Sequence, residues 1–198
     1  MRWALEFARR AQRTTSAGEL GELLYDATVD MGFDYYALIR CDTGQLTDEY
    51  DIHLFNFPRP WTDEIHRRNY FKIDPVRAAA RERRTPFRTH EVGGIPSLTP
   101  DQQEMMAASG GAGLSDGFAT PIAIADEAVG LCSFGLGSHR DFPRDVLGEA
   151  EIIGGFAFEA ARRLKAHNTH MYLSTAGKHQ KGNGFWRGLR GLQPDELK

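Results

Sequence analysis

The sequence predicts an α-β-α sandwich, an α/β (α+β) fold in which a mostly antiparallel five-stranded sheet lies between helices on both sides. Three observations predict it. Helical periodicity runs through residues 17–31 and 145–166, and an apolar hairpin pattern runs through residues 116–138. The chain has 198 residues, 41% of them hydrophobic, which is enough for one domain with a single core.

The N-terminal part predicts two helices followed by two strands. The expected elements are amphipathic helices at 2–12 and 17–31 and strands at 34–41 and 52–57. Ser16 suits the N-cap of the second helix, because Glu19 stands three residues later as in a capping box. Gly32 occupies the usual place of a glycine that ends a helix.

The middle of the chain predicts three helices whose starts are marked by proline. The expected elements are a helix at 61–70, a helix from Asp74-Pro75 to residue 84, a short strand or extended link at 85–89, and a helix from 99 to 109. Asp and Thr are favoured at an N-cap and proline is tolerated in the first turn, so Asp74-Pro75 and Thr99-Pro100 both indicate a helix start.

The C-terminal part predicts the sheet's clearest hairpin, a long helix and a tail. The hairpin at 116–138 has two apolar strands joined by a tight link, and the helix at 145–166 ends in basic residues, as its dipole prefers. From residue 168 neither helical nor strand periodicity continues, and glycine and basic residues become frequent. We therefore expect one folded domain at 1–167 and a flexible basic tail at 168–198.

Composition argues against several classes of protein. The formal net charge of -3 and the pI near 6.2 give no electrostatic case for nucleic-acid binding by the whole chain. Cys41 and Cys132 each lie in an apolar run and are expected to be buried, reduced thiols. No signal peptide and no apolar run of membrane-spanning length is apparent, which favours a cytoplasmic protein without a membrane partner.

No motif supports catalysis, a metal site or a cofactor. The seven histidines are scattered without metal-ligand spacing, and no nucleophile elbow, phosphate-binding loop or dinucleotide fingerprint is present. The sequence therefore indicates a protein that is not an enzyme.

One group of residues indicates a more specific class. Phe57-Pro58-x-x-Trp61, Tyr70, Asp74-Pro75 and, farther on, Gly117 resemble the motif of the autoinducer-binding domain of LuxR-type quorum-sensing regulators. The resemblance covers roughly residues 17–165. It implies a small-molecule signal receptor that acts in transcription regulation and binds an acyl-homoserine lactone or a related autoinducer.

The resemblance also implies roles for individual residues. Trp61 would donate its indole N–H to the lactone carbonyl, and Asp74 would accept the amide N–H of the ligand. Ser133 matches a position where a hydroxyl often lies near the acyl carbonyl, although a serine satisfied by its own sheet explains it equally well. Without the resemblance, the aromatic residues would be interpreted as part of the hydrophobic core and Asp74 as a helix N-cap. Gly117 would be interpreted as a strand glycine at a point where two strands approach closely.

Two positions depart from the family pattern. Ile65 stands where the family has a tyrosine that helps to hold the acyl carbonyl, and Thr89 stands where it has a tryptophan beside the lactone ring. Both changes reshape the pocket. They predict either weakened lactone binding or a changed ligand with a longer, aryl or non-lactone group.

Family members normally continue into a DNA-reading helix-turn-helix domain. Residues 168–198 contain no pair of periodic helices, so no direct sequence-specific DNA binding is expected of this chain. It is expected to form a homodimer, or a heterodimer with a full-length LuxR-type regulator. The alternative is a GAF- or PAS-like interaction module that has lost lactone binding and acts as a dominant-negative partner.

Overall fold

A computed structural model describes residues 2–41, 52–94, 97–137, 140–167 and 171–174. Its centre is a six-stranded sheet of order β3-β4-β5-β1-β2-β6. The strands are β1 (Tyr35–Arg40), β2 (Ile52–Phe55), β3 (Phe87–Arg88), β4 (Leu114–Ile122), β5 (Gly130–Gly137) and β6 (Met171–Ser174). The first five in this order pair antiparallel, as predicted, and β6 adds a parallel edge strand beside β2.

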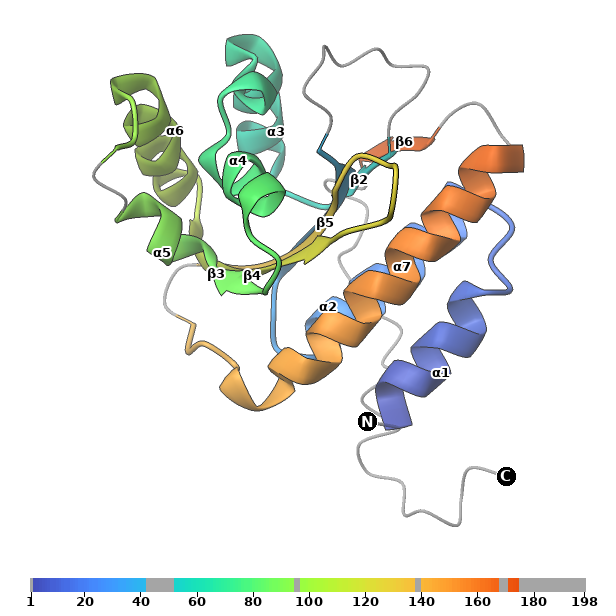
Figure 1. Cartoon of the computed structure of the whole chain (residues 1–198). Helices are drawn as coiled ribbons and strands as arrows, with labels where there is room; N and C mark the ends of the chain where they lie inside the picture. Colours follow the sequence, from blue (N-terminus) through green and yellow to red (C-terminus); the bar gives the residue numbers. More distant parts are fainter. Residues whose placement is uncertain (1, 42–51, 95–96, 138–139, 168–170, 175–198) are drawn as a thin grey trace.

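Helices cover both faces of the sheet, which confirms the predicted sandwich (Figure 1). One face carries α1 (Arg2–Ala11), α2 (Ala17–Asp30) and α7 (Leu147–His167). The other carries α3 (Arg59–Arg68), α4 (Pro75–Glu82), α5 (Thr89–Gly93) and α6 (Pro100–Gly111). Short 3-10 turns lie at Tyr70–Lys72 and Arg144–Val146.

The helix ends follow the cap chemistry that the sequence predicts. The Ser16 side chain accepts the N–H of Glu19 at 3.2 Å, and Gly32 takes a left-handed φ of 89° just beyond α2. Thr99 and Gln102 form a reciprocal capping box at α6. These local signals therefore account for where the helices begin and end.

The two faces of the sheet are packed differently. Toward α1, α2 and α7, large buried side chains fill the interface, among them Phe134 of β5 with Phe7 of α1 and Phe158 of α7. Because side chains alternate along a strand, Ser133 and Gly135 of β5 face the other way, toward α3–α6. Small residues at the centre of that face leave space beneath the helices.

Two features differ from the prediction. Thr89–Gly93 forms the short helix α5, which no sequence signal indicated, so the segment predicted as an extended link at 85–89 keeps only Phe87–Arg88 as strand. Met171–Ser174 pairs with β2 although it belongs to the segment predicted as a flexible tail. Its strand depends on an edge supplied by residues far away in the sequence, and the rest of the predicted tail lies outside the described residues.

Both cysteines are buried and free, as predicted. Burial raises the pKa of the Cys41 thiol to about 11, and burial also raises the pKa of Cys132. Neither thiol is therefore activated as a nucleophile. Within the described residues, no helix is both long and apolar enough to cross a bilayer.

Candidate ligand-binding site

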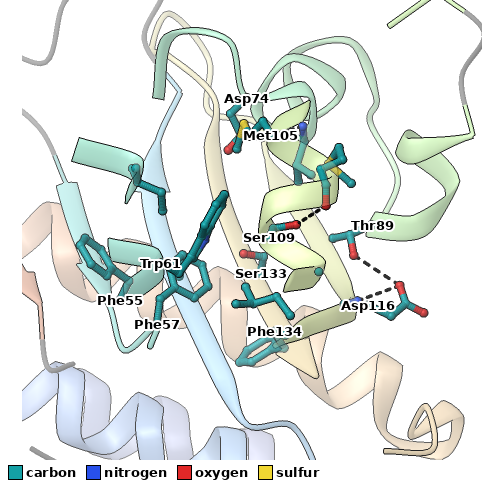
Figure 2. Close-up of a pocket in the computed structure, with 18 of the residues that line it drawn as sticks. Phe55, Phe57, Trp61, Asp74, Thr89, Met105, Ser109, Asp116, Ser133 and Phe134 are labelled. Atoms are coloured by element: carbon teal, nitrogen blue, oxygen red, sulfur yellow. Dashed lines mark hydrogen bonds between the residues drawn. The ribbon is translucent and has the colours of Figure 1, made fainter. Parts of the chain in front are cut away.

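A cavity of about 200 Å³ lies between the sheet and helices α3–α6 (Figure 2). Its sheet side is built from Ala37 of β1, Phe55 of β2, Ser133 of β5 and Gly117 of β4. The helical side contributes mainly Trp61 and Ile65 of α3, Val76 of α4, Thr89 and His90 of α5, and Met105, Met106, Ser109 and Gly110 of α6. The lining is therefore mostly apolar, with a few polar groups, as in typical small-molecule sites.

The cavity spans four neighbouring strands of the sheet. Its lining residues come from β2, β1, β5 and β4, which are successive neighbours in the sheet. Three steps between adjacent strands, each of about 4.8 Å, correspond to a span of roughly 14 Å.

Aromatic side chains form one wall of the cavity. Trp61 is 3% exposed and its ring lies 5.8 Å from that of Tyr70, while Phe55 and Phe57 stack with a centroid distance of 5.8 Å. The indole N–H of Trp61 makes no hydrogen bond to any described residue, although Trp61 lines the cavity. A donor is therefore left for a ligand acceptor on this wall.

Asp74 caps helix α4 with one carboxylate oxygen and leaves the other one free. Its Oδ1 caps α4 by accepting the N–H groups of Val76 at 2.8 Å and Arg77 at 3.3 Å. Asp74 also lines the cavity, and its Oδ2 has no hydrogen-bond partner among the described residues. Burial raises the pKa of Asp74, while the neighbouring Arg77 guanidinium and the two backbone donors act in the opposite direction.

The turn that carries Asp74 is fixed to the sheet by a buried arginine. Arg77 donates to the carbonyl oxygen of Phe71 at 3.0 Å and to that of Arg40 in β1 at 3.1 Å. The side-chain amide of Gln102 in α6 donates to the carbonyl of Ile73 at 3.0 Å. These long-range bonds hold the free oxygen of Asp74 at the edge of the cavity.

Ser133 lies on the floor, between Ala37 of β1 and Ala119 of β4. Its hydroxyl makes no hydrogen bond within the described part of the chain, so the reading in which its own sheet satisfies it finds no support there. Ser133 can both donate to a ligand and accept from one.

Thr89 begins α5 and belongs to a polar cluster around Asp116. Oδ1 of Asp116 accepts from the backbone N–H of Gly117 at 2.8 Å and of His90 at 3.2 Å, and from the Thr89 hydroxyl at 3.3 Å (Figure 2). Oδ2 accepts from Arg88. Burial acts to raise the pKa of Asp116, but the bonds from Arg88, Gly117 and His90 outweigh it and lower that pKa.

Seven of the nine residues that the sequence singled out line this cavity: Phe57, Trp61, Ile65, Asp74, Thr89, Gly117 and Ser133. Tyr70 and Pro75 do not. Tyr70 is buried behind Trp61 and Ile65, and Pro75 is buried in the first turn of α4. Tyr70 therefore supports the aromatic wall from behind.

Sequence reasoning missed the contribution of α6 and of Asp116. Met105, Met106, Ser109 and Gly110 line the cavity, yet α6 has apolar residues too evenly spread for its inner face to be read from periodicity. Asp116 and His90 adjoin the predicted residues Gly117 and Thr89. This adjacency was the only signal in the sequence. Side chains that are neighbours along a strand normally point to opposite faces of the sheet, so Asp116 would not be expected beside Gly117 in the cavity. A bulge between Leu114 and Asp116 interrupts that alternation.

The Tyr70 hydroxyl is buried without a hydrogen-bond partner among the described residues. We expect Tyr70→Phe to keep or raise the free energy of unfolding, by up to about 1 kcal/mol, because an unsatisfied polar group is removed. Urea denaturation measures this difference. A loss of more than about 1 kcal/mol would show that the hydroxyl has a stabilising partner.

The model of the autoinducer binding domain family matches residues 16–164. A comparison with curated protein sequences gave no match.

Three solved structures share the fold. The crystal structure of Escherichia coli SdiA matches with 20% identity and a TM-score of 0.67, covering 88% of this chain and 74% of that one. SdiA in complex with octanoyl-rac-glycerol matches with 20% identity and a TM-score of 0.67, covering 87% and 69%. CepR2 from Burkholderia cenocepacia, an N-acylhomoserine lactone dependent LuxR family transcription factor, matches with 13% identity and a TM-score of 0.62, covering 84% and 95%.

These structural matches have low sequence identity and show the common fold. The family model goes further, since it spans most of the chain, including the cavity and both walls. The chain therefore belongs to the autoinducer-binding domain family, the signal-sensing domain of LuxR-type quorum-sensing regulators.

Proposed function

We propose that this domain is a cytoplasmic receptor for an acylated signal, an acyl-homoserine lactone or a related autoinducer, in quorum-sensing transcription regulation. One observation carries the proposal. A mostly apolar cavity that spans four strands contains three polar groups without a hydrogen-bond partner among the described residues: the Trp61 indole N–H, Oδ2 of Asp74 and the Ser133 hydroxyl. A ligand that fills the cavity would cut these groups off from water, so it must supply their hydrogen-bond partners.

The three groups match the polar part of an acylated amide. Trp61 can donate to a carbonyl of the head group, and Asp74 can accept the amide N–H. Ser133 can donate to the acyl carbonyl. The acyl chain would then contact the apolar lining, where each buried methylene contributes roughly 0.8 kcal/mol.

The two departures from the family pattern widen the range of ligands to be tested. Ile65 lines the cavity but offers no hydroxyl, and Thr89 offers a small polar side chain. SdiA, which has the same fold, has been crystallised with octanoyl-rac-glycerol. Monoacylglycerols therefore belong beside acyl- and aryl-homoserine lactones in the test panel.

Thermal melting of the purified chain with this panel tests the proposal. A ligand at 100 times its Kd should stabilise the fold by about 2.7 kcal/mol, which corresponds to a Tm increase of roughly 5–10 °C. Trp61→Phe keeps an aromatic ring but removes the N–H donor, so it should reduce the shift caused by the best ligand.

Absence of any shift, with a protein that melts cooperatively, would contradict the receptor function. An equal shift for wild type and Trp61→Phe would contradict the role of the indole donor alone. In the first case the domain would act as an interaction module of GAF or PAS type that has lost lactone binding.

We also propose that the domain pairs with a second copy of itself or with a full-length LuxR-type regulator. Leu5 of α1 and Ile152 and Phe156 of α7 are large apolar side chains that are exposed, with 37–55% of their surface accessible. Light scattering of the domain alone and co-purification with a full-length regulator distinguish the two pairings. A strictly monomeric domain that retains no regulator would refute this part of the proposal.

A further inference from the structure

We infer that the end of the cavity above β4 binds a ligand head group that carries a hydrogen-bond donor, such as a hydroxyl group. The inference rests on the proposed function and specifies its ligand class. The residues concerned are Thr89, Ser109, Ser115 and Asp116, all of which line the cavity.

Thr89, Ser109 and Ser115 form the wall at this end of the cavity, and each of their three hydroxyl groups donates its proton to an acceptor within the protein. Thr89 donates to Oδ1 of Asp116 at 3.3 Å, and Ser109 donates to the carbonyl of Met106 at 2.8 Å. Ser115 donates to the carbonyl of Gly137 at 2.9 Å. A hydroxyl has one proton and two lone pairs, so each of these side chains offers the cavity only acceptor capacity.

Asp116 holds this end of the cavity in place. Its carboxylate accepts from Arg88, from the backbone N–H groups of His90 and Gly117 and from the Thr89 hydroxyl, so its lone pairs are used within the protein and it contributes no donor. Nδ1 of His90 lies 3.4 Å from Oδ1 of Asp116. Gly110, in the last turn of α6, brings the negative end of that helix to the same wall.

An acceptor-rich wall discriminates between head groups. A homoserine lactone ring carries two oxygens, and both are hydrogen-bond acceptors. Placed against this wall, they would meet the lone pairs of the protein hydroxyl groups and could form no hydrogen bond with them. A tryptophan at position 89 would hide the wall behind an apolar ring, whereas Thr89 leaves it open. A hydroxyl on the head group instead supplies the missing proton, and sites built to bond a hydroxyl discriminate strongly against analogues that lack it.

Calorimetry with two probes that share an octanoyl amide tests the inference. One is N-octanoyl-homoserine lactone, whose head group has only acceptors. The other is N-(2,3-dihydroxypropyl)octanamide, whose head group has two hydroxyl donors. We expect wild type to bind the diol about 10-fold more tightly than the lactone, the effect of one or two hydrogen bonds.

Thr89→Val keeps the shape of the side chain and removes its lone pairs. It should reduce diol affinity about 5-fold and change lactone affinity less than 2-fold. Ser109→Ala is a second variant that places a better helix former in α6 and should weaken diol binding in the same direction.

Equal binding of both probes by wild type, or unchanged diol affinity in both variants, would overturn the inference and leave the receptor function standing. Failure of wild type to bind either probe or any other acylated ligand would overturn the receptor function, and the inference with it.

Discussion

Asp74→Asn is expected to reduce affinity for the best ligand of the panel at least 10-fold, with the fold intact. Asparagine is as good an N-cap as aspartate, so its oxygen can still accept the N–H groups of Val76 and Arg77. Its NH₂ group then takes the place of Oδ2, and a donor faces the ligand's N–H where an acceptor is needed. A hydrogen bond to a charged group contributes about 1.5–3 kcal/mol, which sets the expected loss.

Isothermal calorimetry with the wild-type ligand measures this loss, and circular dichroism checks that α4 is retained. Asp74→Ala is a poorer test, because it also removes the cap and costs about 1 kcal/mol of stability on its own. Ligand affinity within 2-fold of wild type in Asp74→Asn would rule out the anchoring role.

The same substitution has an expected effect on the unliganded protein. Burial raises the pKa of Asp74, so the folded state holds this proton more tightly than the unfolded chain does. The resulting stabilisation is present below the ordinary pKa of aspartate and is lost as the pH rises through the raised value. Without ligand, Asp74→Asn should therefore melt slightly above wild type at neutral pH, and the difference should vanish in acid.

Gly117→Ala is expected to destabilise the fold by on the order of 3 kcal/mol, the upper range for overpacking. A Cβ atom at this position would lie 2.6 Å from the Phe134 carbonyl oxygen in β5 and 3.3 Å from the Thr89 hydroxyl. The carbonyl is backbone and cannot rotate away, so β4 or β5 must move. Because both strands form the cavity floor, ligand binding should weaken as well.

Gly155→Ala is the matched control, since a Cβ there meets nothing within 4 Å. Alanine is favoured over glycine inside a helix by about 1 kcal/mol, so this variant should be neutral or more stable. Urea denaturation of both variants measures the contrast. Equal stability of the two would show that the strands yield to a methyl group at Gly117.

Much of the fold follows from signals that act between neighbours in the chain. Ser16 with Glu19, Thr99 with Gln102, and Asp74 followed by Pro75 each specify a helix start through bonds spanning two or three residues. The apolar alternation of β4 and β5 predicts their hairpin in the same local way. The resemblance to the family motif added the positions of Trp61, Asp74 and Gly117, which the structure places on one cavity.

Tertiary structure alone decided the rest. The Thr89 hydroxyl meets Asp116 across 27 residues, and Arg77 reaches the Arg40 carbonyl across 37. Contacts of that kind leave no periodicity or spacing in the sequence, because they depend on how β4 and α5, or α4 and β1, come together. The sequence by itself determined the sandwich and indicated seven of the residues that line the cavity. Only packing decided that α6 closes that cavity, and that the wall beside Thr89 offers acceptors but no free hydroxyl proton.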